Sequence, residues 1–131
     1  MEKKHSIVLL MADDDKEDRE FAERALKKAR LCNTIMFVCD GEELMDYLKR
    51  RGKYKDPKLS PVPGVILLDL NMPKKDGREA LKEIKADPAL KEIPVVILTT
   101  SDDDVDVRSA YDLGANSYIT KPVNMDGMVK V

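Results

Sequence analysis

Four short apolar runs of the sequence lead into side chains that could take part in metal or phosphate chemistry. Asp13 and Asp14 follow the first run, Asp69 follows another, Thr99 ends a third, and Lys121 follows the last. If these runs are parallel strands of one sheet, their carboxyl ends meet at the same edge. Two carboxylates about 4 Å apart repel by roughly 4 kcal/mol at an effective dielectric near 20, and a cation relieves that repulsion. The arrangement therefore predicts a cation site built from acidic side chains.

An all-oxygen site of this kind suits Mg²⁺, whose remaining positions can be filled by water or by phosphoryl oxygens. A carboxylate can then act as a nucleophile and form an acyl phosphate, provided that positive charge neutralises the approaching phosphoryl oxygens. Lys121 would supply a point charge to one of these oxygens. The Thr99 hydroxyl and a backbone N–H after Asp69 would donate hydrogen bonds to the others.

The order of apolar and amphipathic segments indicates how these side chains are positioned. Short apolar runs without polar alternation are typical of strands buried on both faces, and here they alternate with segments of helical periodicity. Strand–helix–strand connections make neighbouring strands parallel, so we predict a doubly wound α/β fold, an open parallel sheet with helices on both faces. The predicted strands are residues 7–12, 35–39, 65–68, 95–98 and 117–120, and the predicted helices are an early one ending near 29, then 42–49, 78–86 and 105–113.

One segment does not fit this alternation. Residues 50–64 contain three prolines and two glycines, which predicts a long loop without regular structure.

Length and composition fit one ordinary domain over residues 1–131. The chain has 131 residues, of which 43% are hydrophobic, enough for a single core. Lys and Arg number 23 against 25 Asp and Glu, and the net charge of −2 gives no general attraction to nucleic acid or anionic lipid. The two cysteines lack a CxxC spacing, no apolar run reaches the roughly 18 residues of a membrane helix, and the N-terminal residues do not form a signal peptide. We therefore expect a soluble cytoplasmic protein without nucleic-acid or membrane partners.

Taken together, these motifs resemble the receiver domain of two-component response regulators. The resemblance rests on Asp13-Asp14, on the segment DLNMPKKDG that begins at Asp69, on Thr99, and on Lys121 before a proline. The separations of 30 residues from Asp69 to Thr99 and 22 from Thr99 to Lys121 agree with single-domain chemotaxis-type regulators. The resemblance covers nearly the whole chain and implies a flavodoxin-like five-stranded sheet of order 2-1-3-4-5.

The family resemblance also implies a role for each acidic residue. Asp69 would be the phosphoacceptor. Asp14, Asp69 and the backbone carbonyl of Asn71 would ligate Mg²⁺, and Asp13 would act through bound water. The domain would catalyse only its own phosphorylation and dephosphorylation.

The resemblance implies a switch and a set of partners as well. Thr99 and Tyr118 would form the switch pair, the ring of Tyr118 moving inward when the threonine hydroxyl turns toward the phosphoryl group. The phosphoryl group would come from a sensor histidine kinase or a phosphotransfer protein, and a downstream protein target would read the active state. The Lys121–Pro122 peptide bond is expected to be cis.

Two departures from the family pattern are visible. Asp14 and Asp69 are 55 residues apart, farther than in minimal family members, and the excess falls in residues 50–64. This insertion resembles the stand-alone receivers that include phytochrome-associated regulators. Ten residues follow Lys121, so the fifth helix of the family would be truncated. We expect the apolar area left uncovered to favour a homodimer through the fourth helix, the fifth strand and the stub of the fifth helix.

Other interpretations remain open at this point. The run that begins at Asp13 would also suit a helix N-terminus. An aspartyl-nucleophile phosphohydrolase of the haloacid-dehalogenase type places similar groups together, but it needs a second aspartate where this chain has Asn71. A third interpretation is an adaptor of receiver shape that signals by binding alone.

Overall fold

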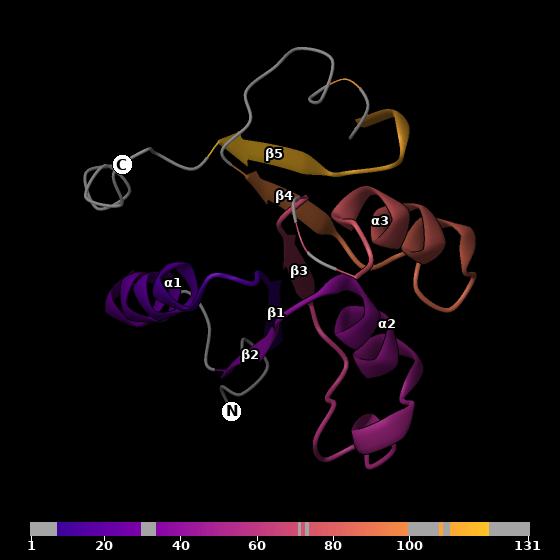
Figure 1. Ribbon diagram of the computed structural model, residues 1–131, viewed down its shortest axis with the longest axis horizontal. Coiled ribbons are helices and arrows are strands. Elements are labelled where there is room, and N and C mark those ends of the chain that lie inside the picture. The colour runs from indigo at the N-terminus through magenta and orange to yellow at the C-terminus, as the bar shows by residue number, and fades with distance from the viewer. Residues whose placement is uncertain are drawn as a thin grey trace, which may run out of the picture.

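The protein forms a parallel sheet with helices on both faces (Figure 1). The computed structural model describes residues 8–29, 34–70, 72, 74–99, 108 and 111–120, and for residues 25–29, 99 and 118–120 it describes the backbone alone. Five parallel strands are hydrogen-bonded in the order β2-β1-β3-β4-β5, which confirms the predicted fold. The strands are β1 Val8–Ala12, β2 Thr34–Val38, β3 Val65–Leu68, β4 Val95–Thr99 and β5 Ser117–Thr120.

Alternate residues of the central strand β1 enter two different cores. Leu10 and Ala12 are fully buried in the larger core, on the face covered by α2 and α3. Leu9 and Met11 belong to the second core and pack with Ala22 of α1. This helix lies on the opposite face of the sheet from α2 and α3 (Figure 1). The helices are α1 Lys16–Ala29, α2 Gly41–Lys49 and α3 Gly77–Ala86. Because β1 is buried on both faces, it has the continuous apolar sequence expected of a central parallel strand.

An aspartate stands at the start of each of these helices. The carboxylate of Asp15 accepts hydrogen bonds from two backbone N–H groups in the first turn of α1, at 2.8 and 3.2 Å. Asp40 and Asp76 are the N-caps of α2 and α3, and each side chain accepts a backbone N–H at 2.7 Å. The capping role considered for the first acidic run therefore falls to Asp15. Asp13 and Asp14 are left to line the edge of the sheet.

Residues 50–64 are not wholly irregular, so that prediction was wrong in part. A short 3-10 helix, η2 Gly52–Tyr54, lies within them, and the side chain of Tyr54 is buried. The three prolines that suggested irregular structure all follow Asp56, so none of them interrupts the turn before it.

Two tyrosines attach this insertion to α2. The rings of Tyr47 and Tyr54 pack with their centroids 5.1 Å apart. The Tyr47 hydroxyl donates to the Pro61 carbonyl at 2.7 Å, and the Tyr54 hydroxyl donates to the Glu43 carboxylate at 2.5 Å. Burial raises the pKa of Tyr47 to about 12, and burial together with the Glu43 carboxylate raises the pKa of Tyr54 as well. Both hydroxyls therefore stay protonated and keep donating at neutral pH.

Most predicted boundaries agree with the structure to within one residue. The bounds predicted for β3 and β5 are those of the structure, and α2 and α3 begin one residue earlier than predicted because their caps are aspartates immediately before a glycine. The predicted helix at residues 105–113 lies mostly outside the described residues. Within this range, residues 108, 111 and 112 are described as helical. Residues 121–131, which contain the predicted fifth-helix stub and the Lys121–Pro122 bond, lie outside them too. Within the part that is described, no helix is both long and apolar enough to cross a bilayer.

The packing of α3 gives a test of the larger core. Leu81 is fully buried there, whereas the neighbouring Lys82 is exposed. Leu81→Ala should lower the free energy of unfolding by about 2–5 kcal/mol, because it removes buried apolar contacts and leaves a cavity. Lys82→Ala is the matched control and should change it by about 0.5 kcal/mol at most. Urea denaturation measures both, and equal effects of the two substitutions would contradict the assigned orientation of α3.

Candidate functional site

The register of the central strands brings two of the predicted acidic residues together. Ala12 of β1 pairs with Leu68 of β3, so Asp13 and Asp69 leave the sheet side by side. The Asp69 N–H donates to the Ala12 carbonyl at 3.0 Å, and the Asp13 N–H donates to the Val38 carbonyl of β2 at 3.1 Å. These backbone hydrogen bonds continue the ladders of the sheet beyond the strand ends. The positions of the two aspartates are therefore set by the rigid sheet.

Three carboxylates meet at this edge. Oxygens of Asp13, Asp14 and Asp69, one from each, lie within 4.8 Å of one another. Asp13 is 1% exposed and Asp69 is 7% exposed, whereas Asp14 is open to solvent. Opposite ligands of one Mg²⁺ lie about 4.2 Å apart, so small side-chain rotations would let this set hold a divalent cation. Two buried acids with a solvent-facing third also leave room for the water that Mg²⁺ retains.

Backbone and side-chain donors steady the loop that carries Asp13. Its Oδ1 accepts a hydrogen bond from the Asp15 N–H at 2.9 Å, and the Arg19 guanidinium donates to its backbone carbonyl at 2.7 Å. The sequence analysis missed Arg19, because nothing in the sequence distinguishes it from a solvated arginine in the first turn of a helix. Its contact places a positive charge beside the acidic cluster, where it reduces the mutual repulsion of the carboxylates.

The loop after Asp69 is closed by a glycine at the start of α3. The Gly77 N–H donates to the Leu70 carbonyl at 3.0 Å. A Cβ on Gly77 would collide with the carbonyl oxygen of Asp69 and with Cα of Leu70. The sequence analysis used this glycine only as part of the segment DLNMPKKDG and did not predict that it lies against the backbone of Asp69.

The same loop also contacts α2. A Cβ on Gly41, the first residue of α2, would run into the backbone carbonyl of Lys75. The Lys74 ammonium lies 3.7 Å from the Asp40 carboxylate, a long ion pair whose lysine is exposed and which contributes little to stability. Close backbone packing, more than this ion pair, therefore fixes the loop between Asp69 and α3 against the start of α2.

The remaining predicted site residues are described in part or not at all. Thr99 ends β4 and pairs with Thr120, the last residue of β5, so these two strands end at the same edge of the sheet. Tyr118 lies in β5. The side chains of Thr99 and Tyr118, and the whole of Asn71 and Lys121, are outside the described residues.

Comparison with known proteins identifies the family. The sequence profile of the response regulator receiver domain matches residues 9–131. The chain therefore belongs to the response regulator receiver family, whose members act in two-component signalling. This membership decides against the phosphohydrolase alternative.

Particular relatives share the sequence pattern and the fold over most of their length. Response regulator Rcp1 of Synechocystis is 44% identical over 124 residues, which are 95% of this chain and 82% of Rcp1. The crystal structure of Mn²⁺-bound Rcp1 has a TM-score of 0.86 and 44% identity, over 95% of this chain and 87% of that one. The phosphorylated cyanobacterial phytochrome response regulator RcpA has a TM-score of 0.87 and 42% identity, with the same coverage.

These similarities bear on two of the predictions. The likeness to a phytochrome response regulator confirms the resemblance inferred from the insertion at residues 50–64. Receiver domains use a divalent metal, and both the Mn²⁺ of the Rcp1 structure and the cluster of Asp13, Asp14 and Asp69 agree with the predicted cofactor.

The close approach at Gly77 can be tested by adding one methyl group. Gly77→Ala should lower the free energy of unfolding by about 1–3 kcal/mol, because the new Cβ forces the backbone of Asp69 and Leu70 to move. Helix propensity alone would stabilise the variant by roughly 0.8–1.0 kcal/mol, so the expected sign distinguishes the two effects. Glu79→Ala, an exposed change in the same turn, is the control. Urea denaturation measures the free energy of unfolding of both variants. The amide NMR signal of Asp69 should shift in Gly77→Ala and stay at its wild-type position in Glu79→Ala.

Proposed function

We propose that Asp69 accepts a phosphoryl group from a histidine kinase or a phosphotransfer protein, and that the domain then changes conformation to signal through protein–protein contacts. The observation that carries the proposal is the convergence of Asp13, Asp14 and a buried Asp69 at one edge of the sheet. A nucleophile at a strand end, fixed by the ladder hydrogen bond to Ala12, is held in one orientation for attack.

In the proposed reaction a carboxylate oxygen of Asp69 attacks the phosphorus of a phosphohistidine. The new O–P bond forms as the P–N bond to the imidazole breaks, and the imidazole leaves with the electron pair of that bond and takes up a proton. The product is an acyl phosphate on Asp69. Bound Mg²⁺ supplies positive charge that offsets the charge of the phosphoryl oxygens. Low exposure of Asp69 limits the hydration of its carboxylate and so favours attack.

The proposed ligands of the cation are those that the receiver-family resemblance implies. We assign direct contacts to the carboxylates of Asp14 and Asp69 and to the backbone carbonyl of Asn71. Asp13, whose Oδ1 is already engaged by the Asp15 N–H, acts through water. Mg²⁺ retains several waters in most protein sites, which suits this division between direct and indirect ligands.

Lys121 and Thr99 would complete the phosphorylation site. Tyr118 would change its orientation when Asp69 is phosphorylated. The pairing of Thr99 with Thr120 supports this proposal, since β4 and β5 end together at one edge of the sheet. Lys121 would neutralise one phosphoryl oxygen, and the Thr99 hydroxyl would donate to another. The movement of Thr99 toward the phosphoryl group would let Tyr118 turn inward and change the surface over β5.

The wider organisation is part of the same proposal. Residues 1–131 form one receiver domain in the cytoplasm, and residues 50–64 are an insertion within it. Its partners are the phosphodonor, a downstream protein and a second copy of the chain, which would meet it through residues 105–113, β5 and the segment after it. A net charge of −2 argues against nucleic acid or a membrane as the target.

Incubation with acetyl phosphate tests the assignment. With Mg²⁺ the wild-type chain should gain a single phosphoryl group, seen by intact mass spectrometry, and with a chelator it should gain none. Asp69→Asn should gain none in either condition, because it removes the nucleophile and preserves the volume of the side chain. Asp112→Asn, an exposed aspartate outside the cluster, should behave as wild type.

Two results would count against the proposal. An Asp69→Asn chain that gains phosphate at the wild-type rate would show that another residue is the acceptor. A wild-type chain that never gains a phosphoryl group would favour an adaptor that signals by binding alone.

A further inference from the structure

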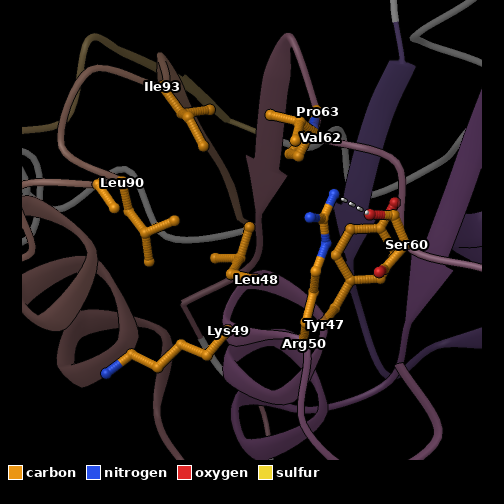
Figure 2. Close-up of a pocket in the computed structure, with 10 residues that line it drawn as sticks. Tyr47, Leu48, Lys49, Arg50, Ser60, Val62, Pro63, Leu90 and Ile93 are labelled. Carbon is orange, nitrogen blue, oxygen red and sulfur yellow. Dashed lines mark hydrogen bonds between the residues drawn. The ribbon is translucent and has the colours of Figure 1, made fainter. Parts of the chain in front are cut away.

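A hollow lies at the opposite edge of the sheet from the carboxylates. It has a volume of about 240 Å³ and lies between the end of α2, the insertion and the chain that leads into β4 (Figure 2). Val62 and Pro63 come just before β3, and Ile93 comes just before β4, so the hollow is at the amino-terminal ends of these strands. Asp69 follows the other end of β3. A molecule bound here would leave the acidic edge accessible.

The walls of this hollow are mostly apolar. Leu48, Leu90 and Ile93 face the same space as Val62 and Pro63 (Figure 2). Val62 is 67% exposed, a large exposure for an apolar residue beside an open apolar hollow. Pockets for small molecules usually measure about 300–1,000 Å³, so this one is better suited to one or two side chains of a protein segment.

Among the described residues that line the hollow, both charged side chains are positive. Lys49 and Arg50 line it, and none of its other described lining residues is acidic. The Arg50 guanidinium lies beside the apolar side chains and donates to the Ser60 carbonyl at 3.3 Å (Figure 2). A guanidinium carries five N–H donors in a planar fork, so donors remain for a carboxylate approaching from solvent.

The backbone conformation at Arg50 is one in which glycine is more common than arginine. Arg50 caps α2 in the left-handed conformation, with φ 55° and ψ 52°, where glycine is usual because it has no Cβ. Anchoring of the insertion does not account for the arginine, because Tyr47 and Tyr54 already hold that segment with shorter hydrogen bonds of 2.7 and 2.5 Å. The side chain of Arg50 therefore needs another explanation.

We propose that this hollow docks a segment of a partner protein that presents an apolar side chain next to one or more carboxylates. The apolar side chain would fill the space beside Leu48 and Val62. The carboxylate would pair with the fork of Arg50, and Lys49 would strengthen the attraction. Because the hollow and Asp69 lie at opposite edges of the sheet, docking would not depend on phosphorylation, and a partner could stay bound while the kinase reaches Asp69.

Random peptides displayed on phage and selected against the wild-type chain test this proposal. Enriched peptides should carry an apolar residue beside Asp or Glu, and a synthetic copy should shift the amide NMR signals of Val62, Leu90 and Ile93. Its affinity should fall about tenfold or more in Arg50→Gly and in Val62→Asp. Arg50→Gly suits the left-handed backbone, so its urea midpoint should equal or exceed that of wild type, which separates lost binding from lost folding.

Lys58→Glu is the matched control, since Lys58 is exposed on the same insertion but does not line the hollow. It should bind the peptide as wild type does, and beryllofluoride, a mimic of the phosphoryl group, should leave the affinity unchanged. The proposal is overturned if no peptide is enriched, if enriched peptides lack the acidic and apolar pattern, or if Arg50→Gly binds as wild type. It is also overturned if Val62→Asp abolishes self-association of the chain, because the occupant would then be a second copy.

Discussion

The mutual repulsion of Asp13, Asp14 and Asp69 is the constraint on which the rest of the structure depends. Like charges this close destabilise the folded state unless the chain holds them in place and a cation offsets them. The sheet meets the first condition, since β1 lies beside β3 and backbone hydrogen bonds extend past both strand ends. Arg19 supplies part of the compensating charge. The short distances between the three carboxylates destabilise the folded state without a metal, and the same short distances allow the carboxylates to bind a metal ion.

The requirement for a precise edge explains the close packing around it. Gly77 allows α3 to begin against the backbone of Asp69. Gly41 allows α2 to begin against Lys75, in the loop between Asp69 and α3. These contacts connect the acidic edge to α2 and, through Tyr47 and Tyr54, to the insertion at residues 50–64. The two edges of the sheet then have separate roles, with chemistry at the carboxyl ends of the strands and a proposed protein contact at the amino ends.

Much of this arrangement could be predicted from the sequence, because buried parallel strands are short apolar runs and their polar successors converge at one edge. The cluster of Asp13, Asp14 and Asp69 follows from that rule. What could not be predicted depends on contacts between distant residues. The turn at Tyr54 is held by Glu43 and packs on Tyr47, and the left-handed backbone of Arg50 is set by the end of α2. The three-residue helix η2 is too short to leave a periodic signal.

Urea unfolding with and without Mg²⁺, for the wild-type chain and for Asp14→Asn, tests the central claim that carboxylate repulsion is balanced by a bound cation. Mg²⁺ should raise the free energy of unfolding of the wild type, by about 2.7 kcal/mol at a concentration one hundred times the dissociation constant. Without metal, Asp14→Asn should be more stable than wild type because one repulsive charge is gone, and in saturating Mg²⁺ the order should reverse because a ligand is lost. A wild type indifferent to Mg²⁺, or an Asp14→Asn chain that is less stable than wild type without metal, would contradict the account.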